Sequence, residues 1–224
     1  MKKEQHWDEA EVEITLGEAV LHGDLRMPHD AVGLVAFAHG SGSSRASPRN
    51  RRVAETLNRE GLATLLLDLL TEEEEAVDRE TAELRFDIGL LGERMVGAVD
   101  WLAQQEVTTD LALGLFGAST GAAAALNAAA ARPDRIAALV SRGGRPDMAA
   151  QALPRVRCPV LLIVGALDTE VLELNRRAAG QLAAPHAVEV VDGATHLFEE
   201  PGALDQVAAH AADWFVRNLT RKAI

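Results

Sequence analysis

Short runs of apolar residues alternate with longer amphipathic segments along most of the chain. The apolar runs have the length of strands buried on both faces of a sheet, and they lie at 33–38, 62–67, 111–116, 136–140, 160–164 and 187–191. Helical spacing of apolar residues predicts helices from 48 to near 61, at 85–105, 122–131, 171–182 and 203–219, with a short helix at 148–153. Strands that alternate with helices in this way predict an α/β fold with a mostly parallel sheet covered on both faces.

The first part of the chain has a different pattern. Residues 12–14 and 19–25 alternate apolar with charged or polar side chains, which predicts two strands at an antiparallel edge with one wet face. The acidic run 72–75 is interpreted as a solvated loop or a first helical turn. Because no linker, repeat or low-complexity boundary interrupts the pattern, we expect residues 1–224 to form a single domain.

Composition narrows the class of function. The net charge of −12 over 224 residues disfavours a nucleic-acid partner, whose phosphates need clustered positive charge. With Cys158 alone, no intrachain disulfide can form, and we expect this thiol to be buried without a role. The first residues do not resemble a signal peptide, and no apolar run reaches membrane-spanning length, so we expect a cytoplasmic protein without a membrane partner. The histidines outside the motifs described next show no metal-ligand spacing, so we predict no metal site and no cofactor.

The residues 117–121 read Gly-Ala-Ser-Thr-Gly, directly after a predicted strand and before an alanine-rich predicted helix. Strand, sharp turn and helix are the context in which Gly-x-Ser-x-Gly forms a nucleophile elbow. Glycines are needed there because a Cβ would collide with the neighbouring strand or helix. We therefore interpret Ser119 as a nucleophile at the N-terminus of the following helix, whose free N–H groups favour a developing oxyanion.

An acid and a base follow Ser119 in the order typical of α/β-hydrolases. Asp168 follows the strand at 160–164, and His196 follows the last strand, so both are expected at the carboxyl edge of the sheet. A serine hydroxyl needs a base to accept its proton, and the imidazole needs a carboxylate to fix its tautomer. Each residue also has a structural interpretation, Asp168 as a helix N-cap and His196 as a surface histidine, and Asp192 competes for the role of the acid.

A turn-forming segment, His39-Gly-Ser-Gly-Ser-Ser44, follows the first buried strand. We assign the two oxyanion donors to the backbone N–H groups of Ser41 and Thr120. His39 is a tentative substrate-binding residue, with a structural role as the alternative.

Several arginines are expected near the same edge. Arg142 and Arg145 follow the strand at 136–140, and both suit a carboxylate or phosphate of the substrate. A further basic group lies beside the glycine-rich segment, at Arg45, Arg49, Arg51 and Arg52. Salt bridges within this acidic chain are an equally good interpretation of all six.

Four segments together resemble the dienelactone hydrolase-like branch of the α/β-hydrolase superfamily. They are residues 39–44, 117–121, Ser-Arg-Gly-Gly-Arg-Pro-Asp at 141–147, and Thr-His-Leu-Phe-Glu-Glu-Pro-Gly at 195–202. The resemblance covers nearly the whole chain, and it implies a central sheet of about eight strands without a large cap domain. Dienelactone hydrolases carry a cysteine nucleophile where this chain has Ser119, so a general ester, thioester or lactone is the expected substrate.

The sequence thus predicts a serine hydrolase acting on a small ester-type molecule through an acyl-enzyme. Two other interpretations stay open, a catalytically silent scaffold used for binding or regulation, and a transferase that passes the acyl group to an acceptor other than water. Segment 68–84 is the only candidate for a lid. A homo-oligomer is left open.

Overall fold

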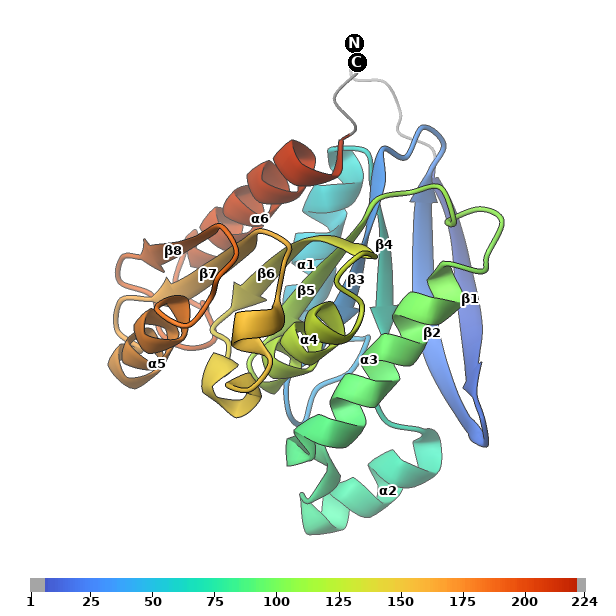
Figure 1. Cartoon of the computed structure of the whole chain (residues 1–224), viewed down its shortest axis with the longest axis horizontal. Coiled ribbons are helices and arrows are strands. Elements are labelled where there is room, and N and C mark those ends of the chain that lie inside the picture. The colour runs from blue at the N-terminus through green and yellow to red at the C-terminus, as the bar shows by residue number, and fades with distance from the viewer. Residues whose placement is uncertain (1–6, 221–224) are drawn as a thin grey trace.

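A computed structural model describes residues 7–220 of the chain. An eight-stranded sheet in the order β1-β2-β4-β3-β5-β6-β7-β8 runs through the molecule (Figure 1). Strands β3 to β8 are parallel to one another, whereas β1 and β2 form an antiparallel hairpin whose second strand pairs with β4. The strands are β1 Trp7–Leu16, β2 Ala19–Pro28, β3 Gly33–Ala38, β4 Leu62–Leu67, β5 Leu113–Ala118, β6 Ile136–Arg142, β7 Val160–Gly165 and β8 His186–Val191.

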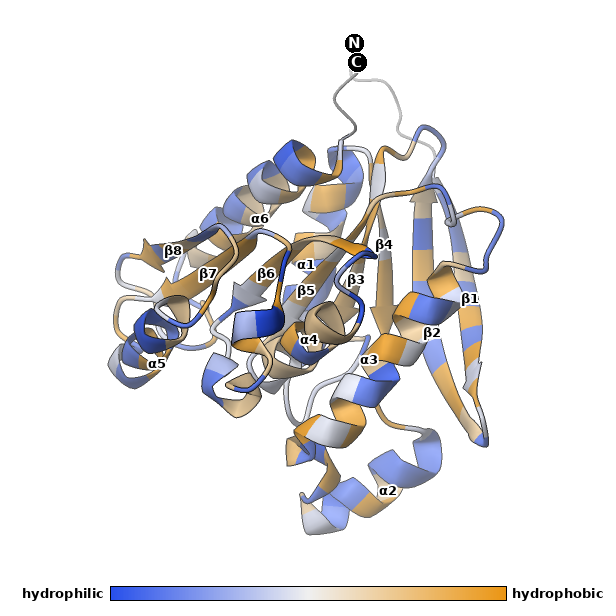
Figure 2. Cartoon of the chain, viewed as in Figure 1, coloured by the Kyte–Doolittle hydropathy of each residue, from blue (hydrophilic) through white to orange (hydrophobic). Residues whose placement is uncertain are grey.

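Helices cover both faces of the sheet. Helices α1 (Pro48–Arg59) and α6 (Ala203–Leu219) pack on one face. The other face is covered by α3 (Ile88–Leu102), α4 (Thr120–Ala131) and α5 (Thr169–Ala179). Helix α2 (Glu72–Thr81) is mostly hydrophilic in Figure 2, whereas the central strands are mostly hydrophobic. Within residues 7–220, no helix combines the length and the apolar character needed to cross a membrane.

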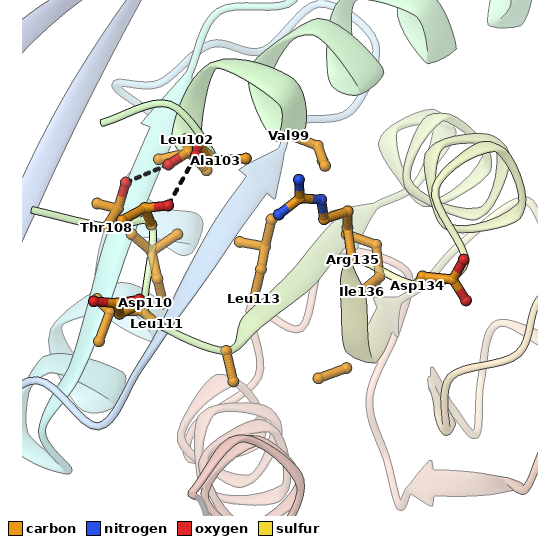
Figure 3. A pocket seen from close by; sticks show the side chains of 14 residues that line it. Val99, Leu102, Ala103, Thr108, Asp110, Leu111, Leu113, Asp134, Arg135 and Ile136 are labelled. Carbon is orange, nitrogen blue, oxygen red and sulfur yellow. Dashed lines mark hydrogen bonds between the residues drawn. The ribbon is translucent and has the colours of Figure 1, made fainter. Parts of the chain in front are cut away.

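A cavity of about 330 Å³ opens at the amino ends of β5 and β6 (Figure 3). Leu113 and Ile136, the first residues of these strands, line it together with the end of α3. The Thr108 hydroxyl donates to the carbonyl of Leu102 at 2.6 Å and closes the turn after α3. Since catalytic groups in such sheets gather at the carboxyl ends of the strands, this cavity lies at the opposite end from the expected site.

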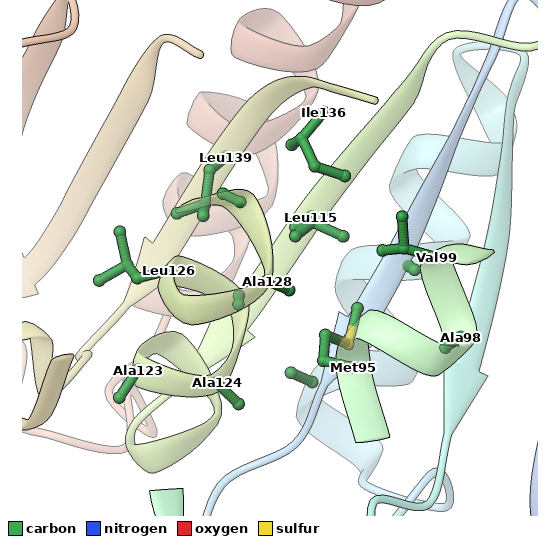
Figure 4. Close-up of a cluster of buried hydrophobic side chains, with 14 of the residues drawn as sticks. Met95, Ala98, Val99, Leu115, Ala123, Ala124, Leu126, Ala128, Ile136 and Leu139 are labelled. Atoms are coloured by element: carbon green, nitrogen blue, oxygen red, sulfur yellow. The ribbon is translucent and has the colours of Figure 1, made fainter. Parts of the chain in front are cut away.

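The core between the sheet and α3 and α4 consists of large aliphatic side chains set against alanine (Figure 4). Met95 and Val99 of α3 are fully buried with Leu115 of β5. Ten of the twelve residues of α4 are buried, because it is enclosed by the sheet and neighbouring helical segments. A helix that is buried on nearly all sides needs no amphipathic stripe, and its small side chains allow close packing.

The predicted sheet and helices are confirmed, and the boundaries that differ have local causes. Strands 33–38 and 62–67 and helix 203–219 have the predicted bounds. Strands β5 and β6 extend farther than predicted, to Ala118 and Arg142, because these two residues still pair. Helix α3 begins three residues later than predicted because the Asp87 carboxylate caps it, accepting from the N–H of Leu90 at 2.9 Å. The predicted helix at 148–153 is replaced by two short 3₁₀ turns, Pro146–Ala149 and Leu153–Arg155.

The acidic run 72–75 is the first turn of α2. Thr71 and Glu74 form a capping box, in which each side chain accepts a hydrogen bond from the other residue's backbone N–H. Farther along, the buried Asp78 carboxylate accepts from the backbone N–H of Arg85 at 2.9 Å and from its Nε at 2.6 Å. Burial alone raises the pKa of Asp78, but the bonds from Arg85 hold it below its usual value. These bonds tie α2 to the 3₁₀ turn Leu84–Phe86 that follows it.

We expect the substitution Met95→Ala to lower the free energy of unfolding by about 2–5 kcal/mol, because Met95 is fully buried and the lost side chain leaves a cavity. Val107→Ala is the matched control, since Val107 is 66% exposed, and its effect should stay within about 0.5 kcal/mol. Urea denaturation of both variants measures the difference. Equal effects would contradict this description of the core.

Candidate active site

The turn between β5 and α4 places Ser119 in a strained backbone conformation. Its φ of 51° and ψ of −121° are rare for a residue with a side chain. A Cβ on Gly117 would lie 2.4 Å from the Cα of Ala122, and one on Gly121 would lie 2.3 Å from the carbonyl oxygen of Ala38. The two glycines therefore let strand and helix approach closely enough to form the turn, as the pattern Gly-x-Ser-x-Gly predicts.

The backbone of Ser119 is held from both sides by the segment that follows β6. Its N–H donates to the carbonyl of Arg142 at 3.2 Å, and its carbonyl accepts from the N–H of Arg145 at 3.1 Å. The residues between Arg142 and Arg145 are in turn fixed by Asn175 of α5, whose side-chain amide donates to the carbonyl of Gly144 at 2.9 Å. The sequence motif 141–147 thus braces the nucleophile turn through its main chain.

Asp168 and His196 come together at the same edge of the sheet. His196 Nδ1 lies 2.6 Å from Asp168 Oδ2. When Nδ1 carries the proton and donates it to this carboxylate, Nε2 is free to accept a proton from a hydroxyl. Asp168 occupies the N-cap position of α5, yet its carboxylate makes no capping hydrogen bond and is directed to His196 instead. Asp192, the competing acid, is exposed to solvent.

Gly143 connects the two halves of this arrangement. It has a φ of 51°, and a Cβ there would lie 3.2 Å from the carbonyl oxygen of His196 and 3.5 Å from its ring. Since Gly143 lies between the two residues that hold Ser119, the same short segment contacts both the Ser119 turn and His196.

The glycine-rich segment after β3 runs against the nucleophile turn. A Cβ on Gly40 would lie 3.0 Å from the Cβ of Ser119. Ser41 and Thr120, whose N–H groups we assign as oxyanion donors, line one narrow cavity of about 10 Å³, roughly the space of one water. Glu75, Asp78 and Arg85 close its other side. Arg85 was not singled out from the sequence, because at the first position of a predicted helix it carried no signal for a contact with this cavity.

His39 is buried, and both of its ring nitrogens bind backbone. Nε2 accepts from the N–H of Leu69 at 3.1 Å, so Nδ1 carries the proton and donates to the carbonyl of Gly40 at 2.9 Å. Burial lowers the pKa of His39, which keeps the ring neutral. This geometry favours a role in fixing the glycine-rich segment over contact with a substrate.

The two arginines predicted near the site differ in their partners. Arg145 forms a bidentate ion pair with Asp147, at 2.9 and 2.7 Å, and this pair raises the pKa of Arg145. Arg142 is 7% exposed, and no described carboxylate pairs with it. Burial, with a smaller contribution from Arg49, lowers the pKa of Arg142 to about 10.

The basic group beside the glycine-rich segment is held by carboxylates, which favours the salt-bridge interpretation for it. Its ion pairs are Arg45 with Glu11, Asp24 and Asp68, Arg49 with Glu199, Arg51 with Asp24, and Arg52 with Asp205.

Two further expectations concern cysteine and metal ions. Cys158 is buried, and burial raises the pKa of its thiol to about 12, which makes it a poor nucleophile. In the described part of the chain, no three His, Cys, Asp or Glu side chains are grouped to hold a metal ion. His6 and most of the N-terminal segment that we compared with a signal peptide lie outside the described residues.

We expect Gly121→Ala to destabilise the protein by about 3 kcal/mol, because its Cβ would overlap backbone atoms that cannot move independently. In the control Gly180→Ala, the added Cβ would lie 3.5 Å from its nearest neighbour, an ordinary contact, and the change should stay within about 0.5 kcal/mol. Urea denaturation compares the two. A small effect of Gly121→Ala would refute the close approach at this turn.

His39 should make the protein less stable in mild acid. Its pKa in the folded protein is below the unfolded value of 6.5, so the unfolded chain binds the proton first as the pH falls. Stability is therefore full above about pH 6.5 and declines below it. The variant His39→Asn cannot titrate, and its stability should depend less on pH between about 7 and 5 than that of the wild type. Denaturation at each pH tests this, and identical slopes would contradict it.

Comparisons with known proteins identify the family and the fold. The model of the Dienelactone hydrolase family matches residues 25–220. A crystal structure of dienelactone hydrolase from Anabaena variabilis is 55% identical, with a TM-score of 0.94 over 95% of this chain and 99% of that one. Est1E from Butyrivibrio proteoclasticus, at 18% identity and a TM-score of 0.79 over 93% of this chain and 98% of that one, shares the fold.

A relative from Mycobacterium tuberculosis, provisionally named a phosphoribosyl transferase, is 54% identical over 209 residues. This match covers 93% of the present chain but 46% of the relative, so the chain spans about half the length of that protein. The predicted fold class and family are confirmed by the family match and by the structural neighbours. The chain belongs to the dienelactone hydrolase family.

Proposed function

We propose that the protein cleaves a small carboxylic ester, thioester or lactone through an acyl-enzyme formed on Ser119. The observation that carries the proposal is the 2.6 Å contact between His196 and Asp168 at the sheet edge where the strained turn presents Ser119. A folded protein tolerates a turn with positive φ at a non-glycine residue when the surrounding structure enforces it, and such turns are concentrated at active sites.

The reaction begins with attack of the Ser119 hydroxyl oxygen on the substrate carbonyl, while His196 Nε2 accepts the hydroxyl proton. The backbone N–H groups of Ser41 and Thr120 stabilise the resulting oxyanion. Collapse of the tetrahedral intermediate breaks the ester bond, and the proton on His196 passes to the leaving oxygen or sulfur. A water molecule, deprotonated by His196, then releases the acid and restores Ser119.

Asp168 acts through His196 in both halves of the reaction. Its carboxylate holds Nδ1 protonated, which leaves Nε2 as the acceptor, and it stabilises the imidazolium that forms. The Asp168 side chain is 15% exposed and that of His196 is 38% exposed, so the carboxylate is the more shielded partner.

The cavity of about 10 Å³ beside Ser41 and Thr120 has the space of about one water, and Ser119 and His196 do not line it, so it does not hold the acyl group. It is bounded by α2 and the following 3₁₀ turn, which the bonds between Asp78 and Arg85 hold in place. This segment overlaps the candidate lid at 68–84. We do not carry over the transferase activity named for the mycobacterial relative, because the match covers less than half of that protein.

We expect Ser119→Ala to abolish turnover of short p-nitrophenyl esters, thioesters and lactones, with a loss of about 10³-fold or more. Ser44→Ala is the control, because Ser44 does not line the cavity at the oxyanion donors, and it should keep wild-type rates. Labelling with a fluorophosphonate tests the nucleophile independently of the substrate panel. Wild-type protein that neither labels nor turns over any member would favour a binding scaffold. Transfer to an added alcohol in preference to water would favour an acyltransferase.

A further inference from the structure

Arg142 is a buried cation for which residues 7–220 supply no counter-ion. The residue is 7% exposed, its Nη1 is fully buried, and that atom has no hydrogen-bond partner. Leaving a charge unpaired in a protein interior costs several kcal/mol, so a folded chain rarely keeps one without a ligand or a function. The other arginines named near this edge of the sheet all have carboxylate partners.

The surroundings of Arg142 add positive potential. Its strand partner Ala118 belongs to the core on the α1 and α6 face, and paired residues of parallel strands point to the same face. On that face lies Arg49, in the first turn of α1, close enough to Arg142 to lower its pKa. The N-terminus of α1 contributes a further partial positive charge.

Other polar atoms in these segments are also buried without a partner. They are Arg49 Nε, Asn50 Oδ1 and Glu200 Oε2. Glu199 pairs with Arg49 at 3.2 Å, and Glu200 accepts from the Thr195 hydroxyl at 2.6 Å through Oε1 while its Oε2 has no partner among the described residues; neither carboxylate forms an ion pair with Arg142. Buried polar atoms that lack protein partners are usually satisfied by water or by a ligand.

The main chain at Arg142 and Gly143 adjoins the proposed catalytic residues. The carbonyl of Arg142 accepts the N–H of Ser119, and the next residue, Gly143, contacts His196. Glu199 and Glu200 follow His196 in the same loop. A group bound at Arg142 would therefore belong to a molecule whose carbonyl can reach Ser119.

We propose that Arg142, supported by Arg49, forms a subsite for an oxyanion group, a carboxylate or a phosphate, carried by the substrate. The planar guanidinium matches both groups because it can donate two parallel hydrogen bonds. The inference rests on the proposed function for the position of the reacting carbonyl. The binding of an anion at Arg142 can be measured without catalysis.

The first test is binding. Succinate and inorganic phosphate should each be compared with sodium chloride of equal ionic strength for their effect on the Tm of the wild type, Arg142→Gln and Arg52→Gln. We expect at least one of the two anions to raise the Tm of the wild type and of Arg52→Gln, whose side chain pairs with Asp205 on the surface, but not that of Arg142→Gln. The more effective anion identifies the group. Equal shifts in all three proteins, or no shift beyond that of chloride, would overturn the subsite.

The second test is specificity. Paired p-nitrophenyl esters that differ only in a terminal methyl, carboxylate or phosphonate group give the ratio of kcat/KM for anionic over neutral substrate. Arg142→Gln should lower this ratio about 10-fold or more, mainly through KM, whereas Arg52→Gln should leave it unchanged. An unchanged ratio in Arg142→Gln would overturn the subsite. If the wild type hydrolyses none of these esters but still binds the anion in the first test, the esterase proposal is rejected and the subsite stands.

The Tm measured without ligand distinguishes a ligand-binding role of Arg142 from a structural one. Arg142→Met removes an unpaired buried charge and keeps the apolar stem, so its Tm without ligand should rise by about 2 °C or more. A fall in Tm would show that Arg142 stabilises the fold through its charge, which contradicts the proposal.

Discussion

The backbone of Ser119 is held at a φ of 51°, and the rest of the site depends on this conformation. Such a residue costs about 1–3 kcal/mol and persists only where its surroundings enforce it. Here the enforcement is steric on one side, where Gly117 and Gly121 allow strand and helix to touch. On the other side it is hydrogen bonding, because Arg142 and Arg145 hold the N–H and the carbonyl of Ser119. The strained backbone lies in the turn between β5 and α4, and the hydrogen bonds that hold it come from the end of β6 and the residues just after it.

This bracing explains why one short segment serves several purposes. Residues 141–147 hold the nucleophile turn by main-chain bonds, contact His196 at Gly143, and are fixed in turn by Asn175. Gly144 is packed so tightly that a Cβ would lie 2.0 Å from the Ser141 hydroxyl oxygen. Main-chain bonds and close packing thus account for most of the residue types in segment 141–147. They do not account for the arginine side chain at position 142.

The sequence predicted what depends on local pattern and on chain order. Continuous apolar runs located the buried strands, and the order of Ser119, Asp168 and His196 located the candidate triad, because the carboxyl ends of parallel strands meet at one edge. It could not predict pairing across the chain. Arg145 lies in the loop after β6 and pairs with Asp147 two residues away, whereas Arg142 is the last residue of β6, and the sequence could not show that no described carboxylate reaches it. The extent of β5 and β6 was missed for a similar reason, since glycine and serine at their ends resemble a loop until the strands pair.

The pairing of arginines with carboxylates sets Arg142 apart from the other arginines near the site. The chain carries a net charge of −12, so a free arginine would find a carboxylate at low cost almost anywhere on its surface. The arginines around α1 do so: Arg45, in the loop before α1, pairs with β1, β2 and the loop after β4, and Arg49 and Arg51 fasten the helix itself to the loop after β8 and to β2. Against this excess of carboxylates, a buried cation whose main chain binds Ser119, and which no described carboxylate pairs, requires a separate cause. An anionic group supplied by the substrate provides one, because it would neutralise the charge only while the reacting carbonyl is bound.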